Sequence, residues 1–200
     1  TGLYEATEGQ VLIDGIDVRT LPRDVLRQRI ACVFQDFNQY QFSVRENVGY
    51  GSPSHRDDQS RLERAIDKGG AEDFVRALPG GVDTQLGRWF PGGVELSGGQ
   101  WQRIALSRAF MREEADILIL DEPTAALDAE AERQVFERFS KLAQGRTALL
   151  ISHRFPTVRM ADHIVVLDAS RIVEQGSHGE LLAQGGQYAS MFQTQASGYR

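Results

Sequence analysis

Two neighbouring carboxylates end an apolar run near the middle of the chain. The run Ile117–Leu120 is typical of a strand buried on both faces, and Asp121 and Glu122 follow it directly. Open α/β sheets bind their ligands outside the carboxyl ends of the strands, and successive side chains of a strand point in different directions. One carboxylate could therefore hold a cation while the other acts as a base, as in phosphoryl transfer. Taken alone, the pair could also be an exposed strand end that happens to be acidic.

A second candidate site is the sequence Ser-Gly-Gly-Gln, which has the pattern of a helix start. Ser97 and Gln100 have the spacing of a capping box, and Gly98 and Gly99 leave the backbone N–H groups of the first turn uncovered. Because the first N–H groups of a helix lack internal partners, a phosphate group could satisfy them. The alternative is an ordinary helix cap next to loop glycines.

Together, in this order and at this separation, the two patterns resemble a known family. Leu96–Gln100 is similar to the signature motif, and Ile117–Glu122 to the Walker B strand, of the ATP-binding cassette (ABC) transporter ATPases. The resemblance covers essentially the whole chain. It implies an α/β fold: a P-loop NTPase-like ABC ATPase core with an inserted helical subdomain and peripheral antiparallel β hairpins, truncated at its N-terminus.

Two further polar residues match motifs of this family. Gln35 follows an expected buried strand at 30–34 and matches the Q-loop glutamine, and His153 follows another at 146–152 and matches the switch histidine. A lone Gln in a loop, or a lone His at a strand end, is more often structural. The resemblance instead implies that Gln35 binds Mg²⁺ or orients water and so reports whether the γ-phosphate is present, and that His153 contacts the γ-phosphate.

The resemblance also implies a role for each residue around one Mg²⁺-bound ATP. Asp121 and Gln35 would bind Mg²⁺, Glu122 would polarise the attacking water, and His153 would steady the γ-phosphate. Ser97, Gly98, Gly99 and Gln100 would cap the ATP held by a second cassette, which implies a head-to-tail dimer.

Other segments match the family less closely. Leu127 and Asp128 match the better-defined half of the D-loop, but Ala125 stands where serine is common. Arg88 lies in a loop where exporter-type members usually carry an acidic residue. The 200 residues contain no G-x-x-x-x-G-K-[ST] phosphate loop, so we expect the isolated chain to be inactive as an ATPase.

Glycine and proline positions suggest how the chain is organised. We expect residues 43–112 to form a helical subdomain that carries the signature motif, inserted into an α/β core of residues 1–42 and 113–200. The expected helices span 21–29, 44–48, 57–68, 71–78, 97–111, 129–144, 176–182 and 186–195. The expected hairpins pair 10–13 with 16–18 and 164–167 with 172–175.

Composition limits the partners. The net charge is −6, the wrong sign for a protein held to nucleic acid by phosphate neutralisation. Cys32 is the single cysteine, so no internal disulfide can form, and a reducing compartment is expected. No apolar stretch approaches the roughly 20 residues of a membrane span. Any membrane connection must therefore come through a partner or through sequence outside these residues.

The expected partner surface follows Gln35. Phe37, Tyr40 and Phe42 place three aromatic side chains in an expected exposed segment, and exposed aromatic residues often mark a contact site. In the resembled family, this region meets the transmembrane domain, which implies a place at the cytoplasmic face of the inner membrane.

Three functions therefore remain open. The first is the ATP-hydrolysing subunit or domain of an ABC transporter, with export favoured by the closing helices. The second is a soluble ABC-type ATPase of DNA repair or translation, although neither long coiled coils nor a tandem cassette is present. The third is a non-catalytic fragment of a transport cassette. The transported substrate is not encoded here, because membrane helices select it in this family.

Overall fold

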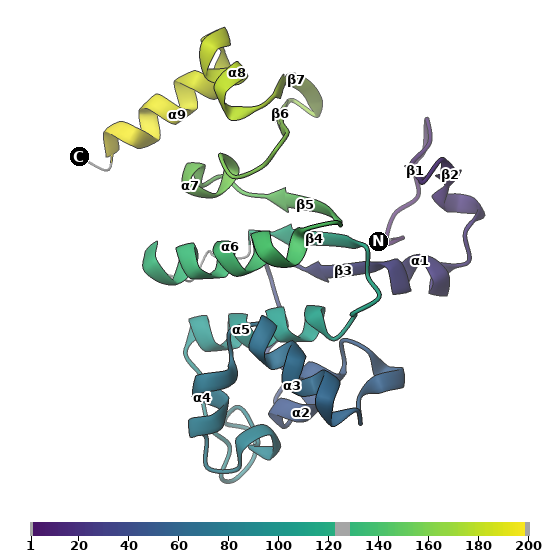
Figure 1. The fold of residues 1–200 in the computed structure, drawn as a ribbon, viewed down its shortest axis with the longest axis vertical. Coiled ribbons are helices and arrows are strands. Elements are labelled where there is room, and N and C mark those ends of the chain that lie inside the picture. The colour runs from purple at the N-terminus through teal and green to yellow at the C-terminus, as the bar shows by residue number, and fades with distance from the viewer. Residues whose placement is uncertain (1, 123–128, 199–200) are drawn as a thin grey trace. The chain divides into compact units, whose positions relative to one another are not determined.

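The computed structural model describes residues 2–122 and 129–198, and the chain forms two compact units (Figure 1). The first unit is Thr1–Leu149 and the second is Leu150–Arg200. Each unit contains its own helices and strands.

The first unit begins with a short hairpin. β1 (Leu12–Ile13) pairs antiparallel with β2 (Ile16–Asp17) through Asp14 and Gly15, whose φ angles are 53° and 78°. Positive φ at both central residues is the requirement of a type I′ hairpin turn, which explains the Asp-Gly pair. A 3₁₀ turn, η1 (Val18–Thr20), leads to helix α1 (Arg23–Arg29). The helix starts later than the expected residue 21, because Pro22 is its N-cap.

β3, β4 and β5 form a three-stranded sheet in that order, in which β3 and β4 belong to the first unit and β5 crosses the boundary after Leu149. β3 (Ile30–Val33) and β4 (Ile117–Asp121) run parallel, with Ile30 opposite Ile117 and Val33 opposite Leu120. The strands contribute four almost fully buried side chains, Ala31, Val33, Leu118 and Leu120. Helix α6 (Ala129–Ala143) follows β4 and buries Val135, Phe136 and Phe139.

The burial expected for 146–152 is wrong. β5 (Thr147–Ile151) forms as predicted, but Leu149 is 53% exposed and Ile151 46% exposed. β5 is an outer strand of the sheet, beside β4 alone. β3 is also an outer strand beside β4, but helices α1 and α5 (Gly98–Phe110) pack against it and cover its side chains. The apolar run predicted a strand, but it carries no information on the order of strands.

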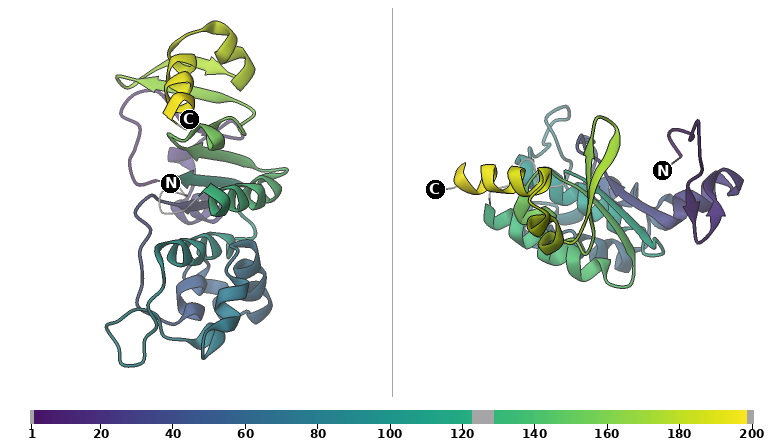
Figure 2. Two further views of the ribbon diagram at one scale, coloured as in Figure 1. Left: turned by 90° about the vertical axis from the view of Figure 1, so that its left-hand side faces the viewer. Right: turned by 90° about the horizontal axis from the view of Figure 1, so that it is seen from above.

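Four helices form a separate layer within the first unit (Figures 1 and 2). They are α2 (Val44–Gly49), α3 (Gln59–Lys68), α4 (Glu72–Ala77) and α5 (Gly98–Phe110), joined through 3₁₀ turns η2 (Pro53–His55) and η3 (Gly81–Asp83). Their common core includes side chains without solvent exposure, namely Val44, Val48, Leu62, Ile104 and Met111. Because all four helices lie within residues 43–112, the helical content expected for this segment is confirmed.

Ion pairs connect α3 to the segment that leads into β4. Arg61 is buried and donates to Glu114, while Arg64 and Lys68 both contact Glu113 at 2.9 and 3.2 Å. The hydrogen bond from Arg64, together with Lys68, lowers the pKa of Glu113 to about 2. The helical layer and the start of β4 are therefore held together by charge as well as by packing.

The second unit contains α7 (Phe155–Val158), the hairpin β6 (Ile164–Asp168) and β7 (Arg171–Gly176), and helices α8 (His178–Gln184) and α9 (Gln187–Gly198). The hairpin turns at Ala169 and Ser170, both with positive φ, and is seen clearly in Figure 2. The core of the unit comprises Phe155, Ile164, Leu181 and Tyr188. None of the helices described in either unit has the length and apolar character needed to cross a bilayer.

The ion pairs of Glu113 predict an acid-sensitive contact. Since the pKa of Glu113 is about 2 when folded and near 4.5 when unfolded, the stability it contributes is present above pH 4.5 and is lost as the pH falls towards 2. Glu113→Gln should lower the free energy of unfolding at pH 7, and the difference from wild type should shrink over that window. Urea titrations at stepped pH measure this difference.

The control for this prediction is Glu63→Gln. Glu63 is an exposed carboxylate on α3 that accepts a hydrogen bond from Gln59, and glutamine keeps an acceptor there. A difference for Glu113→Gln that stays constant from pH 7 to pH 2 would contradict the electrostatic explanation.

Gly51 offers a test of how closely α5 approaches its neighbours. A Cβ atom at Gly51 would lie 1.8 Å from the Arg108 carbonyl oxygen and 2.9 Å from Met111 Cβ. Gly51→Ala should therefore destabilise the protein by about 1–3 kcal/mol, the usual cost of overpacking. Gly179→Ala is the control, because no atom lies within 4 Å of a Cβ there. Chemical denaturation of both variants gives the comparison, and equal stability would refute the close approach.

Candidate functional site

The parallel pairing of β3 with β4 brings Gln35 and Glu122 together. Gln35 lies two residues beyond Val33 and Glu122 lies two beyond Leu120, and those two strand residues are opposite each other. The Gln35 Nε2 atom donates a hydrogen bond of 3.3 Å to Glu122 Oε2. Two of the side chains predicted to form the site are therefore in contact at the carboxyl edge of the sheet.

Glu122 has an unusual backbone conformation. Its φ angle is 45°, in the left-handed region that side-chain-bearing residues seldom adopt. The other described non-glycine residues with positive φ are Asp14, Ala169 and Ser170, which all lie in hairpin turns. Strained backbone of this kind persists where surrounding structure fixes it, and it is concentrated at functional sites. The strain adds a second, independent feature to the site at Glu122.

Asp121 is the last residue of β4 and is partly exposed. Its carboxylate, with the carboxylate of Glu122 and the amide of Gln35, forms a set of oxygen donors. Oxygen donors are the ligands that Mg²⁺ prefers, and Mg²⁺ is usually held by one or two carboxylates together with phosphate oxygens and water. Among the described residues, no group of three His, Cys, Asp or Glu side chains could hold a metal ion by itself. The donor chemistry fits Mg²⁺, whose binding by Asp121 and Gln35 stays a prediction.

The helix start predicted at Ser97 is confirmed in detail. Ser97 is the N-cap of α5, its Oγ accepts from Gln100 N at 3.3 Å, and Gln100 Oε1 accepts from Ser97 N at 2.9 Å. Ser97 and Gly98 are exposed, and the first turn of the helix carries no acidic residue.

Two other helices begin with the same kind of cap but with a charged residue. The capping boxes of α2 and α8 use Glu46 and Glu180 where α5 uses the neutral Gln100. A carboxylate at this position would repel an anion from the N–H groups of the first turn. The start of α5 is therefore the better suited of the three to receive a phosphate group.

A buried Asn and a partly buried Arg hold the segment that follows Gln35. Asn47 has no solvent exposure, and its Nδ2 atom donates to the carbonyl oxygens of Tyr40, Phe42 and Ser43 at 2.8, 3.2 and 3.0 Å. Arg108 of α5 donates to Asn47 O at 2.9 Å, to Asn47 Oδ1 at 3.1 Å and to Asn38 O at 3.2 Å.

The guanidinium of Arg108 also lies 4.6 Å from the centroid of the Tyr40 ring, in cation–π geometry. Burial lowers the pKa of Arg108 from its usual value. The sequence analysis missed Arg108 and Asn47. The detectable signal was a polar side chain at an apolar position of a short helix pattern, beside Val44 and Val48.

The aromatic surface expected after Gln35 is present with one change. Tyr40, Phe42 and Tyr50 form a cluster with ring centroids 5.7–6.1 Å apart, and they are 36%, 38% and 55% exposed. Phe37 is only partly exposed, and Tyr50 at the end of α2 completes the cluster instead. We call Tyr40, Phe42 and Tyr50 the aromatic cluster.

A loop with further exposed aromatic side chains is joined to the same segment. Trp89 is 80% exposed, and its backbone N donates to Gln41 Oε1 at 2.8 Å. Arg88, which departs from the family pattern, pairs with Glu95 at 3.5 Å, and Glu95 also accepts from Trp101 Nε1. Arg88 therefore forms an ion pair within its own loop, and its partner Glu95 is bound in turn by Trp101 of α5.

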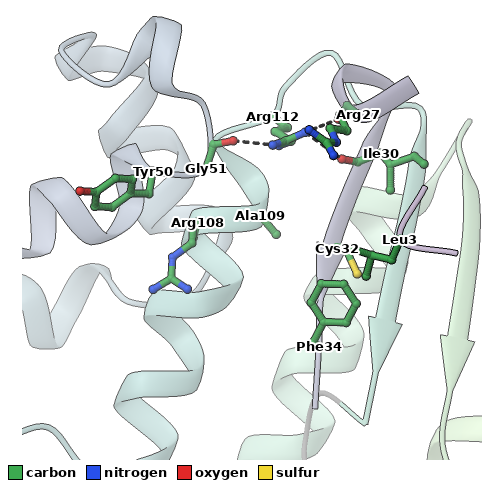
Figure 3. A pocket seen from close by; sticks show the side chains of 10 residues that line it. All are labelled: Leu3, Arg27, Ile30, Cys32, Phe34, Tyr50, Gly51, Arg108, Ala109 and Arg112. Carbon is green, nitrogen blue, oxygen red and sulfur yellow. Dashed lines mark hydrogen bonds between the residues drawn. The ribbon is translucent and has the colours of Figure 1, made fainter. Parts of the chain in front are cut away.

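Figure 3 shows a cavity of about 270 Å³ between α5 and β3. Arg112, which lines the cavity, donates to the carbonyl oxygens of Gly51 and Arg27. Burial raises the pKa of the Cys32 thiol to about 11, so the thiol stays protonated and unreactive, in agreement with the packing role expected for it. Neither Glu122 nor Gln35 lines the cavity, which we therefore do not assign to the candidate site.

The structure does not place the remaining predicted residues beside Gln35 and Glu122. His153 belongs to the second unit, so its convergence with the carboxylates of the first unit stays a prediction. Leu127 and Asp128, predicted to form the D-loop, lie outside the described residues.

Comparisons with known proteins agree with the family resemblance. A model of the ABC transporter family matches residues 1–125. The chain is 46% identical over 189 residues to an ATP-dependent lipid A-core flippase of Bordetella avium, covering 94% of this chain and 31% of the flippase. It is 42% identical over 183 residues to the subtilin transport ATP-binding protein SpaT of Bacillus subtilis, covering 91% of this chain and 30% of that protein.

A solved structure, that of a bacterial Atm1-family ABC exporter with ATP bound, matches with a TM-score of 0.85 at 35% identity. The match covers 96% of this chain and 33% of the exporter chain. The chain thus spans about a third of the length of these relatives.

The buried Asn47 generates a prediction of stability. Asn47→Leu removes the donor to three carbonyl oxygens and leaves Arg108 without one acceptor, so it should destabilise the protein by about 2 kcal/mol or more. Asn38→Ala is the control, because the Asn38 side chain is exposed and its carbonyl, which Arg108 contacts, is retained. Urea denaturation compares the two variants. Similar stabilities would show that the Asn47 bonds contribute little.

Proposed function

Because this chain belongs to the ABC transporter family, we propose that it is the ATP-binding and ATP-hydrolysing domain or subunit of a transporter, and that it drives export across a membrane. The observation that carries the proposal is the hydrogen bond between Gln35 and Glu122, two motif residues brought together at the carboxyl edge of the sheet. The similarity to ATP-dependent and ATP-bound exporters supports the direction of transport.

In the proposed mechanism, Glu122 is the general base. Its carboxylate orients and polarises the water that attacks the γ-phosphate, and its strained backbone fixes the direction of the side chain. Gln35 donates to Glu122 through Nε2, which leaves its amide oxygen available as a ligand. Movement of the segment after Gln35 would therefore change the position of the base.

Asp121 and Gln35 would hold Mg²⁺ through oxygen atoms. When bound, the ion offsets the negative charge that develops on the phosphate oxygens. His153 would donate a hydrogen bond to the γ-phosphate and so stabilise the same charge.

The start of α5 serves a second nucleotide. Ser97, Gly98, Gly99 and Gln100 offer an uncharged and partly exposed helix start. The N–H of Gln100 binds Ser97 Oγ, and those of Gly98 and Gly99 have no partner within the helix because they lie in its first turn. In the proposal, this surface contacts ATP bound to a second cassette, and the two cassettes close head-to-tail on two shared nucleotides. ATP would stabilise the closed pair, and its hydrolysis would release it.

The aromatic cluster is the proposed contact with a transmembrane domain. Its three rings are partly exposed, and the segment from Gln35 to Phe42 connects it to the base. Binding there would place the chain at the cytoplasmic face of the inner membrane. Residues 43–112 would act as a helical subdomain that moves relative to a core of 1–42 and 113–200.

A second candidate applies to the 200 residues taken alone. They contain no G-x-x-x-x-G-K-[ST] phosphate loop, the element that cradles the nucleotide phosphates in P-loop proteins. A chain without this loop would fold but would bind ATP weakly and would not turn it over. No feature of the described residues favours a soluble ABC-type ATPase of DNA repair or translation.

The test compares this chain with a version extended upstream through a phosphate loop. Fluorescent ATP with Mg²⁺ should bind the extended protein and should bind the 200-residue chain much more weakly. In the extended protein, Glu122→Gln should reduce turnover by about 10³-fold or more while ATP binding is retained, because only the base is lost.

Glu63→Gln is the control for this substitution, since Glu63 is an exposed carboxylate on α3. Unchanged turnover in the Glu122→Gln protein would remove Glu122 from the mechanism. Tight binding and turnover by the 200-residue chain would refute the importance of the phosphate loop.

A further inference from the structure

The backbone that carries His153 is held by a side chain of the last helix. The Nε2 atom of Gln195 on α9 donates to the His153 carbonyl oxygen at 2.8 Å, and Gln195 Oε1 accepts from the Phe155 backbone N at 3.4 Å. One carboxamide therefore binds both a carbonyl and an N–H on either side of Arg154. All of these residues belong to the second unit.

One face of α9 makes these contacts. Tyr188, Phe192 and Gln195 follow one another at spacings of four and three residues, which places them on the same side of a helix. The ring of Phe155 meets Tyr188 and Phe192 edge-on, with centroid separations of 5.3 Å in both cases. The same face of α9 therefore contacts the Phe155 ring and, through Gln195, the backbone on either side of Arg154. We call the two hydrogen bonds of Gln195 the clamp.

The position of α9 is fixed from its other end. Glu174 of β7 accepts hydrogen bonds from the backbone N atoms of Gln187 and Tyr188, the first residues of the helix. Tyr188 is 3% exposed, and its hydroxyl is hydrogen-bonded to His178 Nδ1 at 2.8 Å. Because these contacts set the position of α9, the carboxamide of Gln195 reaches the turn from a rigid support.

We propose that Gln195 is a positioning residue for His153, and that α9 thereby controls how the imidazole is presented to the terminal phosphate of the nucleotide. The inference rests on the proposed role of His153. Helix α7 has only one turn, and its N–H groups at Thr157 and Val158 bind the Arg154 carbonyl, so the helix itself holds Arg154, whereas Gln195 holds the residues on either side of it. The clamp restricts the backbone at residues 153 and 155 and so limits the directions in which the His153 side chain leaves it.

The proposal predicts effects on catalysis without large effects on ATP binding. Positioning matters when charge develops on the γ-phosphate, so loss of the clamp lowers the fraction of molecules with a correctly placed imidazole. The contacts that hold the rest of the nucleotide are unaffected. The expected result is therefore a lower kcat with a nearly constant KM for ATP.

The first experiment measures the clamp itself in the 200-residue chain. Gln195→Leu removes both hydrogen bonds and should increase amide exchange of the Phe155 N–H about tenfold, as measured by NMR. Gln195→Glu keeps an acceptor for that N–H but loses the donor to the His153 carbonyl, so the Phe155 protection should be largely retained while the His153 ring resonances shift. Gln193→Glu is the control, since Gln193 is exposed on the same helix. Wild-type exchange in Gln195→Leu would overturn the clamp.

The second experiment uses the version extended upstream through a phosphate loop. Gln195→Leu and Gln195→Glu should each lower kcat about tenfold and change the KM for ATP by less than about twofold, while Gln193→Glu stays at the wild-type value. Combined with His153→Ala, neither change at Gln195 should lower kcat further, because both act through the same imidazole.

The outcomes separate the two proposals. If His153→Ala leaves turnover unchanged, the role proposed for His153 is wrong, and the positioning role of Gln195 is overturned with it. If His153→Ala lowers turnover to a small but measurable rate while both Gln195 variants keep the wild-type kcat, the catalytic role of His153 stands and the positioning role of Gln195 is wrong. If a variant at Gln195 lowers kcat equally in the His153→Ala background, the effect does not pass through His153 and the proposal fails.

Discussion

The parallel pairing of β3 with β4 is the constraint on which the candidate site depends. The two strands are separated in sequence by the whole helical segment, so Gln35 and Glu122 are near each other only because their strands pair in one register. Asp116 N donates to Arg29 O at 3.1 Å, and the Arg29 side chain contacts the Asp116 carboxylate, which fixes this register where the strands begin. A shift by one residue would exchange the buried and exposed faces of β4 and would separate the amide from the base.

The segment after Gln35 is attached at both ends. Gln35 contacts Glu122 at one end, Asn38 and Tyr40 contact Arg108, and Asn47 binds the carbonyl groups of Tyr40, Phe42 and Ser43 at the other end. Arg108 lies on the helix whose first turn carries the signature residues. A few side-chain hydrogen bonds therefore connect Glu122, the aromatic cluster and the helix whose start is proposed to face a second nucleotide.

Local sequence patterns predicted most of the helices and strands, but fewer of the burial states and side-chain contacts around them. The capping box at Ser97, the strand before Asp121 and both hairpins follow from residue type and spacing over a few positions. The exposure of β5 and the buried bonds of Asn47 depend on residues distant in sequence, and no local pattern contains that information. The Gln35–Glu122 contact was predictable only after the family resemblance had identified the two strands as neighbours. No sequence pattern indicated that Tyr50 would complete the aromatic cluster in place of Phe37. The position of Tyr50 at the end of α2 depends on how α2 packs against α5.

Two departures from local preference occur at the candidate site, and they have one explanation. Glu122 adopts a left-handed backbone, which usually costs a side-chain-bearing residue about 1–3 kcal/mol. The start of α5 uses glycines and a neutral Gln100, although Glu46 and Glu180 show that this chain also builds charged capping boxes. Neither choice favours the stability of the isolated element, since glycine weakens a helix and a first-turn carboxylate would strengthen it. In the proposed mechanism, both choices would leave polar groups directed at a bound anion or at its attacking water, and the ligand would account for them where the fold does not.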